Sequence, residues 1–519
     1  MATTHRDALT CAWLLAGLSG LLQHANVHAQ ERTHSVTPLI GVKLEHTDNV
    51  DGVSDGSGQD PRSENILTLS PALIFQHRGP SNTLEGRFGV LVEKRLQNTS
   101  SDRILPDGLL RWRSELREQG LGLDASLLAQ QVKPVISSVG SASDSTNTSA
   151  TETRASISPF LERRLSERNS LIGRLNGSLQ RTDPREDLQR STRTRSSGAQ
   201  LAWVTRPAPF GYSLEASTLN ENARHETPAQ SSSVAAITER GETRQRTLRA
   251  TLLYAWHEEL ELGLIAGTEK DERVASLDTA GLRLRTERRF DGPFGGLLAT
   301  WRPTPRTTLS GQFESREAGR NWNTELSHRL RRTTFALTGS QTTSRNAPTL
   351  LTGRSAPTTT APNPDTGGIL TGAPSTSIRG EVASAALSVQ RDLAMRVTYE
   401  GVRSTLSLAS GRFQSRALLS TTTSAPGTER SRYNAGTISY RLTPEVSPVA
   451  GLRWSRAQDT AGLSRREWLM NLGVNIRLSP RTTLEGGLSL LRSTATSASR
   501  PDGDHTTIHS ANIRLEHRF

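Results

Sequence analysis

Polar and apolar residues alternate along many runs of this chain, and no other feature restricts its fold as strongly. Side chains two residues apart lie on the same face of a β-strand, so each run predicts a strand with one apolar and one polar face. The segment 466–480, for example, places Trp468, Met470 and Leu472 opposite Glu467 and Asn471. Such runs extend over about ten to thirteen residues, which suits a tilted membrane strand better than a soluble strand of about five or six.

The N-terminal 29 residues predict a cleaved secretory signal peptide. Arg6 precedes an apolar stretch at 8–22, and small residues before Gln30 form a cleavage site after Ala29. The single cysteine, Cys11, lies within this stretch. The mature chain is therefore expected to contain no thiol, no disulfide and no cysteine metal site.

After residue 30 no stretch approaches 18 apolar residues, so an exported chain that crosses a membrane must do so as a closed barrel. The connections between the alternating runs are of two kinds. Short turns containing proline or glycine, such as those near Gly79, Pro207 and Pro303, alternate with long polar segments such as 48–64 and 137–152. Short turns at one end and long loops at the other are typical of bacterial outer-membrane barrels.

These patterns predict an all-β chain that forms a single transmembrane up-and-down antiparallel β-barrel of about 22 strands, within a range of about 16 to 24. We expect a short periplasmic segment at 30–36 and the barrel at 37–519, with the longest extracellular loop at about 344–377. Both termini are expected at the short-turn end. The segment 281–295 is interpreted as a loop. Trp203, Trp256 and Trp301 fall at strand ends beside short turns, where an aromatic girdle would place them.

The charge of the chain suggests a nucleic-acid partner at first sight, because the formal net charge is +12. The basic residues are nearly all arginines, but no basic run of five or six occurs. Aromatic residues make up only 4%, so stacking platforms for bases are scarce. We therefore expect no nucleic-acid binding. The hydrophobic fraction of 34% would also suit a disordered chain, but these residues are placed periodically rather than scattered.

The chain ends on a phenylalanine that closes an alternating run from Ile508 to Phe519. Ile513, Leu515 and Phe519 resemble the C-terminal signal that outer-membrane barrels present to the barrel assembly machinery. His517 departs from that pattern, in which an aromatic or aliphatic residue is usual. The resemblance implies that this machinery is a partner and that the last strand closes the barrel against the first.

Three short motifs together resemble the outer-membrane barrel family associated with PEP-CTERM/exosortase and exopolysaccharide loci. They are LEHTDNV at Leu44, LTLSPAL at Leu67 and WRPTPRTTL at Trp301. Their order and spacing agree over most of the mature chain, although His46 stands where an aromatic residue tends to precede the Thr-Asp-Asn. The resemblance implies the outer membrane of a Gram-negative bacterium, contact with its lipid and a link to polysaccharide secretion. It implies no catalytic residues.

Candidate metal and catalytic sites are weak. Four aspartates in the first long segment could hold calcium, but their spacing does not match an EF-hand loop: Asp48, Asp51, Asp55 and Asp60. His505 and His509 are four residues apart, a spacing that brings side chains together on a helix and not in a segment that enters a strand. No nucleophile motif such as G-x-S-x-G occurs. We predict no catalytic residues, no metal site and no cofactor.

The polar face of the alternating runs is the remaining candidate. Its predicted lumen-facing residues are Arg249, Arg453, Arg477, Glu485, Arg514 and Glu516. An interior of arginines and carboxylates could form a water-filled pore with a preference for anionic solutes. The alternative is that these groups pair across strands and only satisfy one another. A one-residue shift in register would reverse every assignment.

Two classes of function follow. The first is a pore or accessory in exopolysaccharide or PEP-CTERM-type surface export, with an anionic polysaccharide as partner and long loops that gate the outer mouth. The alternative is a non-conducting surface structural or adhesive barrel, and a general diffusion porin is third. A TonB-dependent receptor is disfavoured, because only about seven residues lie between the predicted cleavage site and the first strand, too few for a plug domain.

Overall fold

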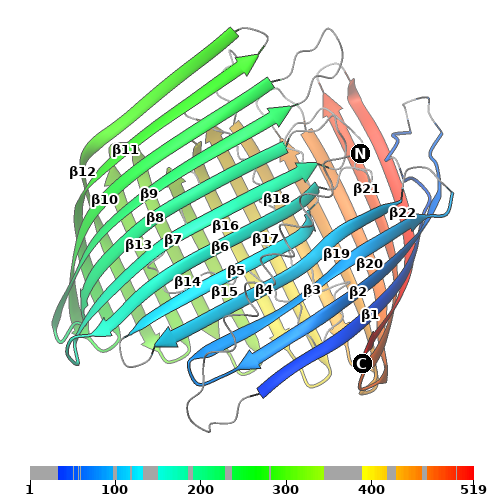
Figure 1. Ribbon diagram of the computed structural model, residues 1–519, viewed down its shortest axis with the longest axis horizontal. Helices are drawn as coiled ribbons and strands as arrows, with labels where there is room; N and C mark the ends of the chain where they lie inside the picture. Colours follow the sequence, from blue (N-terminus) through cyan, green and yellow to red (C-terminus); the bar gives the residue numbers. More distant parts are fainter. Residues whose placement is uncertain are drawn as a thin grey trace.

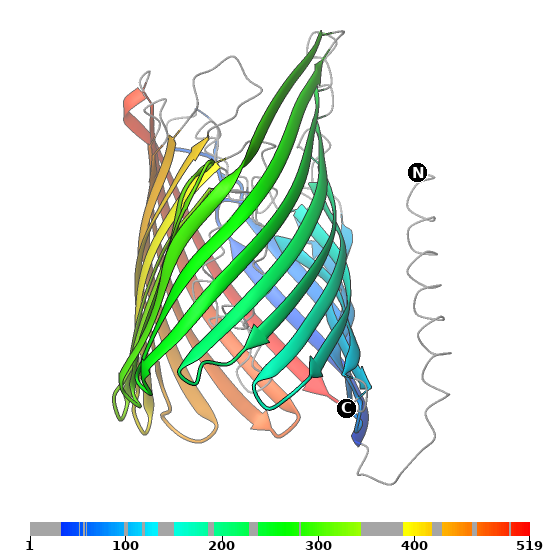
Figure 2. The same cartoon turned by 90° about the vertical axis from the view of Figure 1, so that its left-hand side faces the viewer.

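The computed structural model describes residues 33–50, 52–55, 58, 60–97, 102–116, 120–132, 150–184, 191–227, 237–279, 282–343, 388–417, 428–458, 464–497 and 500–519. These residues form one antiparallel sheet of 22 strands that closes into a barrel (Figures 1 and 2). The predicted fold class and the predicted strand number are therefore confirmed. None of the described residues forms a helix long and apolar enough to cross a membrane.

The strands follow one another around the barrel in chain order. They are β1 (Thr33–Thr47), β2 (Glu64–Arg78), β3 (Asn82–Arg95), β4 (Arg103–Leu116), β5 (Leu121–Val132), β6 (Ala150–Arg164), β7 (Asn169–Pro184), β8 (Ser191–Thr205), β9 (Phe210–Thr227), β10 (Ile237–His257), β11 (Leu260–Thr279), β12 (Leu282–Thr304), β13 (Thr307–Arg316), β14 (Gly319–Arg329), β15 (Thr333–Thr343), β16 (Ser388–Glu400), β17 (Ser404–Ala417), β18 (Thr428–Tyr440), β19 (Val446–Gln458), β20 (Ser464–Ser479), β21 (Thr482–Ser497) and β22 (Arg500–Arg518).

The barrel closes where the last strand meets the first. β1 and β22 pair from Leu39 opposite Arg518 to Thr47 opposite Ser510. The backbone N–H of Phe519 donates to the carbonyl of Pro38 over 3.0 Å, which extends the seam to the final residue. Closure matters because a sheet edge with unpaired backbone groups cannot lie in hydrocarbon.

The two ends of the barrel differ in their connections. β10 and β11 are joined through residues 258–259 and β12 and β13 through 305–306, whereas 16 residues, 48–63, connect β1 and β2 at the opposite end. The C-terminus lies at the end with the short turns (Figure 2). β1 starts at this same end, where Thr33 lies opposite Arg78. The first strand therefore begins and the last strand ends at the short-turn end of the barrel, as predicted.

Three neighbouring strands are longer than the sequence patterns indicate. β10, β11 and β12 contain 21, 20 and 23 residues and rise above the other strands in Figure 2. The interpretation of 281–295 as a loop was wrong, because β12 includes residues 282–295 and pairs with β11 along them. Outward positions here are polar, such as Arg285 and Glu287. The apolar alternation therefore ends while the backbone pairing continues.

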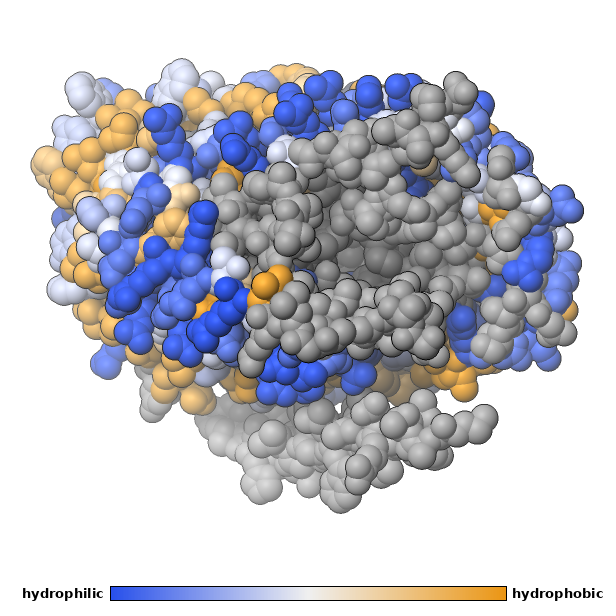
Figure 3. Space-filling view, turned by 90° about the horizontal axis from the view of Figure 1, so that it is seen from above, coloured by the Kyte–Doolittle hydropathy of each residue, from blue (hydrophilic) through white to orange (hydrophobic). Residues whose placement is uncertain are grey.

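The outward face carries the apolar residues and the inward face carries the polar ones. Leu248 and Leu252 of β10 are 58% and 49% exposed, whereas Thr251 on the other face is buried. Seen from the long-loop end, hydrophilic residues dominate the rim and hydrophobic residues appear along the outer margin (Figure 3). This is the arrangement of a membrane-spanning barrel with a polar lumen.

Aromatic residues gather on the outward face near the short turns. Trp203 packs edge-on against Tyr212, and Tyr254 contacts both Phe210 and Trp256, with ring centroids 4.9–6.2 Å apart. Trp301 lies beside the neighbouring turn and is 48% exposed. Amphipathic rings at this level mark a membrane–water interface.

Some predictions fall outside the described residues. The signal peptide at 1–29, residues 30–32 of the segment 30–36 and the loop at 344–377 belong to this group. Thr33 lies within the segment 30–36 but already belongs to β1, so the barrel begins before residue 37.

Candidate functional site: the inner wall of the barrel

The inner wall is polar along much of its circumference. Serine hydroxyls form hydrogen-bonded pairs between neighbouring strands, at Ser126 with Ser156 and at Ser178 with Ser196, each over 2.7 Å. Ser158 donates to Asn176 over 2.8 Å between these pairs. A barrel of more than 16 strands encloses a lumen too wide for its own side chains to fill, so these groups face water or whatever occupies the lumen.

One group of charged residues spans β10 to β13, and we call it the β10–β13 cluster: Arg249, Glu269, Phe294, Glu314 and Arg316. Glu314 is only 2% exposed, accepts a hydrogen bond from Arg316 over 2.6 Å and forms an ion pair with Arg249 over 3.2 Å. Arg316 also reaches Glu269 over 2.5 Å. Its guanidinium lies 4.5 Å from the centroid of the Phe294 ring, which holds it by a cation–π contact.

This cluster is balanced in charge, with two arginines and two carboxylates. Two glutamines complete its hydrogen bonds: Gln312 donates to Glu314 over 2.7 Å and Gln245 donates to Glu269 over 2.5 Å. Each carboxylate therefore accepts from more than one donor. Such a satisfied network is rigid, because moving one member leaves a charged group without its partner.

A second aromatic and charged group lies on β4 to β7. Phe160 is 8% exposed, and the guanidinium groups of Arg113 and Arg174 lie 5.2 and 5.3 Å from its ring centroid. Asp124 lies within 3.8 Å of both arginines. Gly122 faces the ring from β5, and a Cβ atom there would collide with Phe160. The ring therefore occupies space that is free only because residue 122 is glycine.

The six residues predicted to face the lumen occupy different parts of the wall. Arg249 belongs to the β10–β13 cluster, and its side chain is 17% exposed. Arg453 lies on β19 at the position between outward Leu452 and Trp454. Arg477 lies near the end of β20, where its backbone N–H donates to Glu445 over 2.7 Å.

The other three lie together beside the barrel seam. Glu485 of β21 is 4% exposed and stands directly opposite Arg514 of β22. Arg514 contacts Glu516 over 2.8 Å. Lys43 and Glu45, both on β1, form a further ion pair of 2.5 Å beside the seam. Ion pairs therefore recur beside the seam, and the two named here join residues two apart on one strand.

The first long segment docks against the barrel rather than gathering its aspartates. Asp48 accepts from the backbone N–H of His509 over 2.8 Å and lies 2.6 Å from its Nδ1 atom. The backbone N–H of Asp55 donates to the carbonyl of His505 over 2.7 Å. Asp51 lies outside the described residues. Within the described part of the chain, no three histidine, cysteine or acidic side chains are grouped as metal ligands would be.

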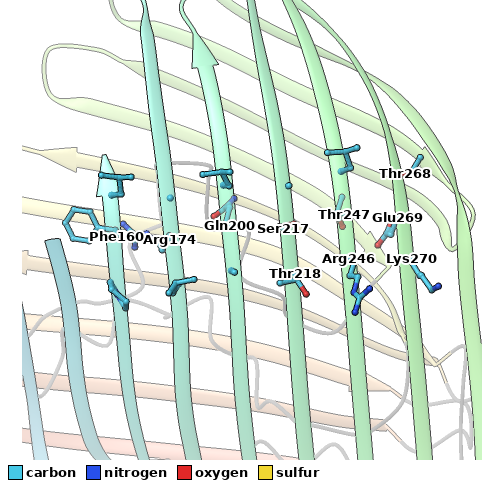
Figure 4. A pocket seen from close by; sticks show the side chains of 18 of the residues that line it. Phe160, Arg174, Gln200, Ser217, Thr218, Arg246, Thr247, Thr268, Glu269 and Lys270 are labelled. Atoms are coloured by element: carbon cyan, nitrogen blue, oxygen red, sulfur yellow. The ribbon is translucent and has the colours of Figure 1, made fainter. Parts of the chain in front are cut away.

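A hollow near the inner clusters lies on the outer side of the wall. It has a volume of about 810 Å³ and extends across β5 to β12 (Figure 4). The leucines that line it point outward: Leu175, Leu201 and Leu248 are 56%, 52% and 58% exposed. Arg246 and Lys270, labelled in Figure 4, lie beside one another at its edge. Since this face contacts lipid, the hollow is not a site for a solute that passes through the lumen.

Sequence reasoning missed the residues that make the inner clusters. Glu314 follows the outward-pointing Phe313, so its inward direction was open to prediction. Glu269 and Arg316 lie between polar neighbours, where no alternation of hydrophobicity indicates the face. The contacts between these residues could not be predicted from the sequence, because Arg316 on β13 reaches across β12 to Glu269 on β11. The sequence pattern also predicts a loop at 281–295, where β12 pairs with β11.

Comparisons with known proteins extend the fold assignment. No protein-family model matches the chain, and no curated protein sequence matches it. Among solved structures, the siderophore receptor PiuA from Acinetobacter baumannii is similar, with 10% identity and a TM-score of 0.51. The match covers 95% of this chain and 82% of that one.

The ferric citrate transporter FecA is similar as well, with 9% identity, a TM-score of 0.51 and coverage of 93% of this chain and 78% of that one. At this identity the likeness concerns the fold. The closed 22-stranded wall, its outward leucines and its aromatic girdle are together those of a β-barrel of the Gram-negative outer membrane.

Proposed function

We propose that the protein is a passive outer-membrane conduit, or an accessory of one, for an exported polysaccharide. The observation that carries the proposal is the composition of the inner wall. Hydrogen-bonded serine pairs and ion pairs of balanced charge lie on the same wall as the rings of Phe160 and Phe294. Sugars present many hydroxyl groups and apolar ring faces. Paired carboxylates and guanidiniums offer acceptors and donors to the hydroxyls, while an aromatic ring offers a surface to the ring face.

Passive passage requires weak binding at many places rather than tight binding at one. The inner wall suits this requirement, because its charged groups are already satisfied by one another. The resemblance of three sequence motifs to barrels of PEP-CTERM/exosortase and exopolysaccharide loci also supports a polysaccharide. The alternative function is a non-conducting surface scaffold, whose loops make the contacts.

Single-channel conductance of the refolded mature protein in a planar bilayer tests the proposal. A neutral and an anionic polysaccharide are added in turn to one side. We expect stable open steps of ionic current, and each polymer should interrupt the current when it enters the lumen. The polymer that more closely matches the exported polysaccharide should interrupt the current for longer. Preference for the anionic polymer would support the predicted role of the inward arginines.

The variant Arg316→Gln removes one inner guanidinium, and Arg285→Gln, on the outward face and 66% exposed, is the matched control. We expect the first to change the duration of polymer block severalfold and the second to leave it unaltered. A folded protein, shown by heat-dependent gel migration, that gives no conductance would overturn the conduit and favour the scaffold.

A further inference from the structure

Four arginines lie side by side on the outward face of β17–β20. The strand register pairs them in turn, and together we call them the arginine row: Arg412, Arg432, Arg456 and Arg466. They share the outward face with Leu408, Leu452 and Trp468, which are 46%, 46% and 49% exposed. The row therefore faces the surroundings of the barrel rather than the lumen.

The arginine row is unfavourable in isolation. The Cβ atoms of directly opposed residues on neighbouring strands lie about 4.5–5.5 Å apart, and two like-charged side chains in such a pair destabilise a sheet. No position on the outward face of the described strands β17–β20 is Asp or Glu. The strands themselves thus provide no counter-charge for these four guanidiniums.

A comparable row on nearly the opposite side of the barrel shows the difference. It runs outward across β7–β10: Arg181, Arg193, Arg224 and Arg240. Here Asp183 contacts Arg181 over 2.7 Å, and Glu226 contacts Arg224. Where the chain compensates adjacent arginines itself, it places an acid two residues along the same strand. The arginine row of β17–β20 lacks this device.

The height of the arginine row relative to the membrane identifies what surrounds it. From Val446, at the short-turn end of β19, to Arg456 is ten residues, or about 34 Å of strand at about 3.4 Å per residue. A tilt of about 45° reduces this to about 24 Å, close to the apolar band of about 25 Å. Trp454 and Trp468, with ring centroids 6.4 Å apart, lie one step below the row.

The row and the tryptophan pair therefore lie at the headgroup level of the leaflet on the long-loop side. Long loops point out of the cell in outer-membrane barrels, so this is the outer leaflet. A guanidinium binds phosphate by two parallel hydrogen bonds, which an ammonium cannot do. Three strand spacings make the row about 14 Å wide, so more than one phosphate can be bound along it.

We propose that the arginine row is a binding site for the phosphorylated glycolipid of the outer leaflet. The guanidiniums of Arg432 and Arg456, in the centre of the row, hold phosphate groups. The rings of Trp454 and Trp468 lie beneath the sugar, at the boundary with its acyl chains. The lipid then supplies the negative charge that the strands lack.

The test is a titration of the refolded mature protein in neutral detergent with diphosphorylated lipid A, dephosphorylated lipid A and phosphatidylglycerol, followed by tryptophan fluorescence. We expect the intact protein to bind the diphosphorylated form at least tenfold more tightly than either other lipid. The double variant Arg432→Gln/Arg456→Gln should lose at least tenfold in affinity for it. The control Arg331→Gln/Arg332→Gln removes two exposed arginines from the short turn after β14 and should stay within twofold.

Equal binding of the dephosphorylated lipid by the intact protein would overturn the proposal, and this result does not depend on any variant. Equal binding of phosphatidylglycerol would exclude recognition of the glycolipid. Unchanged affinity in the Arg432→Gln/Arg456→Gln variant, or an equal loss in the control, would show that the arginine row is not the site.

Discussion

Glu314 is the residue whose surroundings most clearly connect packing with charge on the inner wall. Its carboxylate is 2% exposed and lies between Arg249 and Arg316, whose side chains are 17% and 16% exposed. Replacing it by alanine leaves two largely buried guanidiniums without their common partner. Removal of one member of a buried ion pair costs about 3–5 kcal/mol, and the wet lumen favours the lower end. We expect Glu314→Ala to lower the free energy of unfolding by about 3 kcal/mol, measured by urea unfolding in detergent.

The matched control for this change is Glu287→Ala. Glu287 pairs with Arg285 over 3.7 Å, but both side chains are more than half exposed on the outward face of β12. Exposed ion pairs contribute about 1 kcal/mol or less. A loss for Glu314→Ala no larger than for this control would show that the β10–β13 cluster does not stabilise the barrel.

At the scale of elements, the seam between β1 and β22 is the contact on which closure depends. Leu44 lies opposite Ile513, and both side chains point outward with 43% and 50% exposure. Opposed residues of antiparallel strands have the Cα separation that a disulfide needs. In a Cys11→Ser background, we expect Leu44→Cys/Ile513→Cys to form a disulfide on mild oxidation, detected by a gel-mobility shift that reductant reverses.

The register control moves one cysteine by two residues, as Leu44→Cys/Leu515→Cys. Leu515 lies opposite Val42, so this pair should cross-link much less. Equal cross-linking of the two pairs would contradict the seam register.

The role of Ile513, Leu515 and Phe519 as a signal to the assembly machinery stays a prediction, which the folding rate of Phe519→Ala in the presence of that machinery can test.

At the scale of the whole molecule, the asymmetry of the connections sets the orientation of the barrel. Asp60, in the long segment before β2, and Ser81, in the short turn after β2, are both exposed and lie at opposite ends. In the Cys11→Ser background, we expect a bulky maleimide to label Asp60→Cys on intact cells. Ser81→Cys should react only after the outer membrane is permeabilised. The reverse pattern would mean that the barrel is inserted the other way round.

The strand character, the closed barrel and the two faces of each strand were predictable from the sequence, because alternation is a local property. Trp468, Met470 and Leu472 can avoid water on one side only if Glu467 and Asn471 share the other. The same reasoning failed at 282–295, where polar residues such as Arg285 and Glu287 occupy the outward face of β12. Alternation of hydrophobicity disappears there, although the backbone remains paired with β11.

What only the tertiary structure decided is which charged residues meet. The contact of Arg316 with Glu269 crosses an intervening strand, and the arginine row combines residues from four strands. The sequence by itself determined that each alternating run has one apolar and one polar face, since side chains two residues apart along a strand point the same way. The partners of the charged residues depend on register between strands far apart in the chain, and register is fixed only when the whole sheet closes.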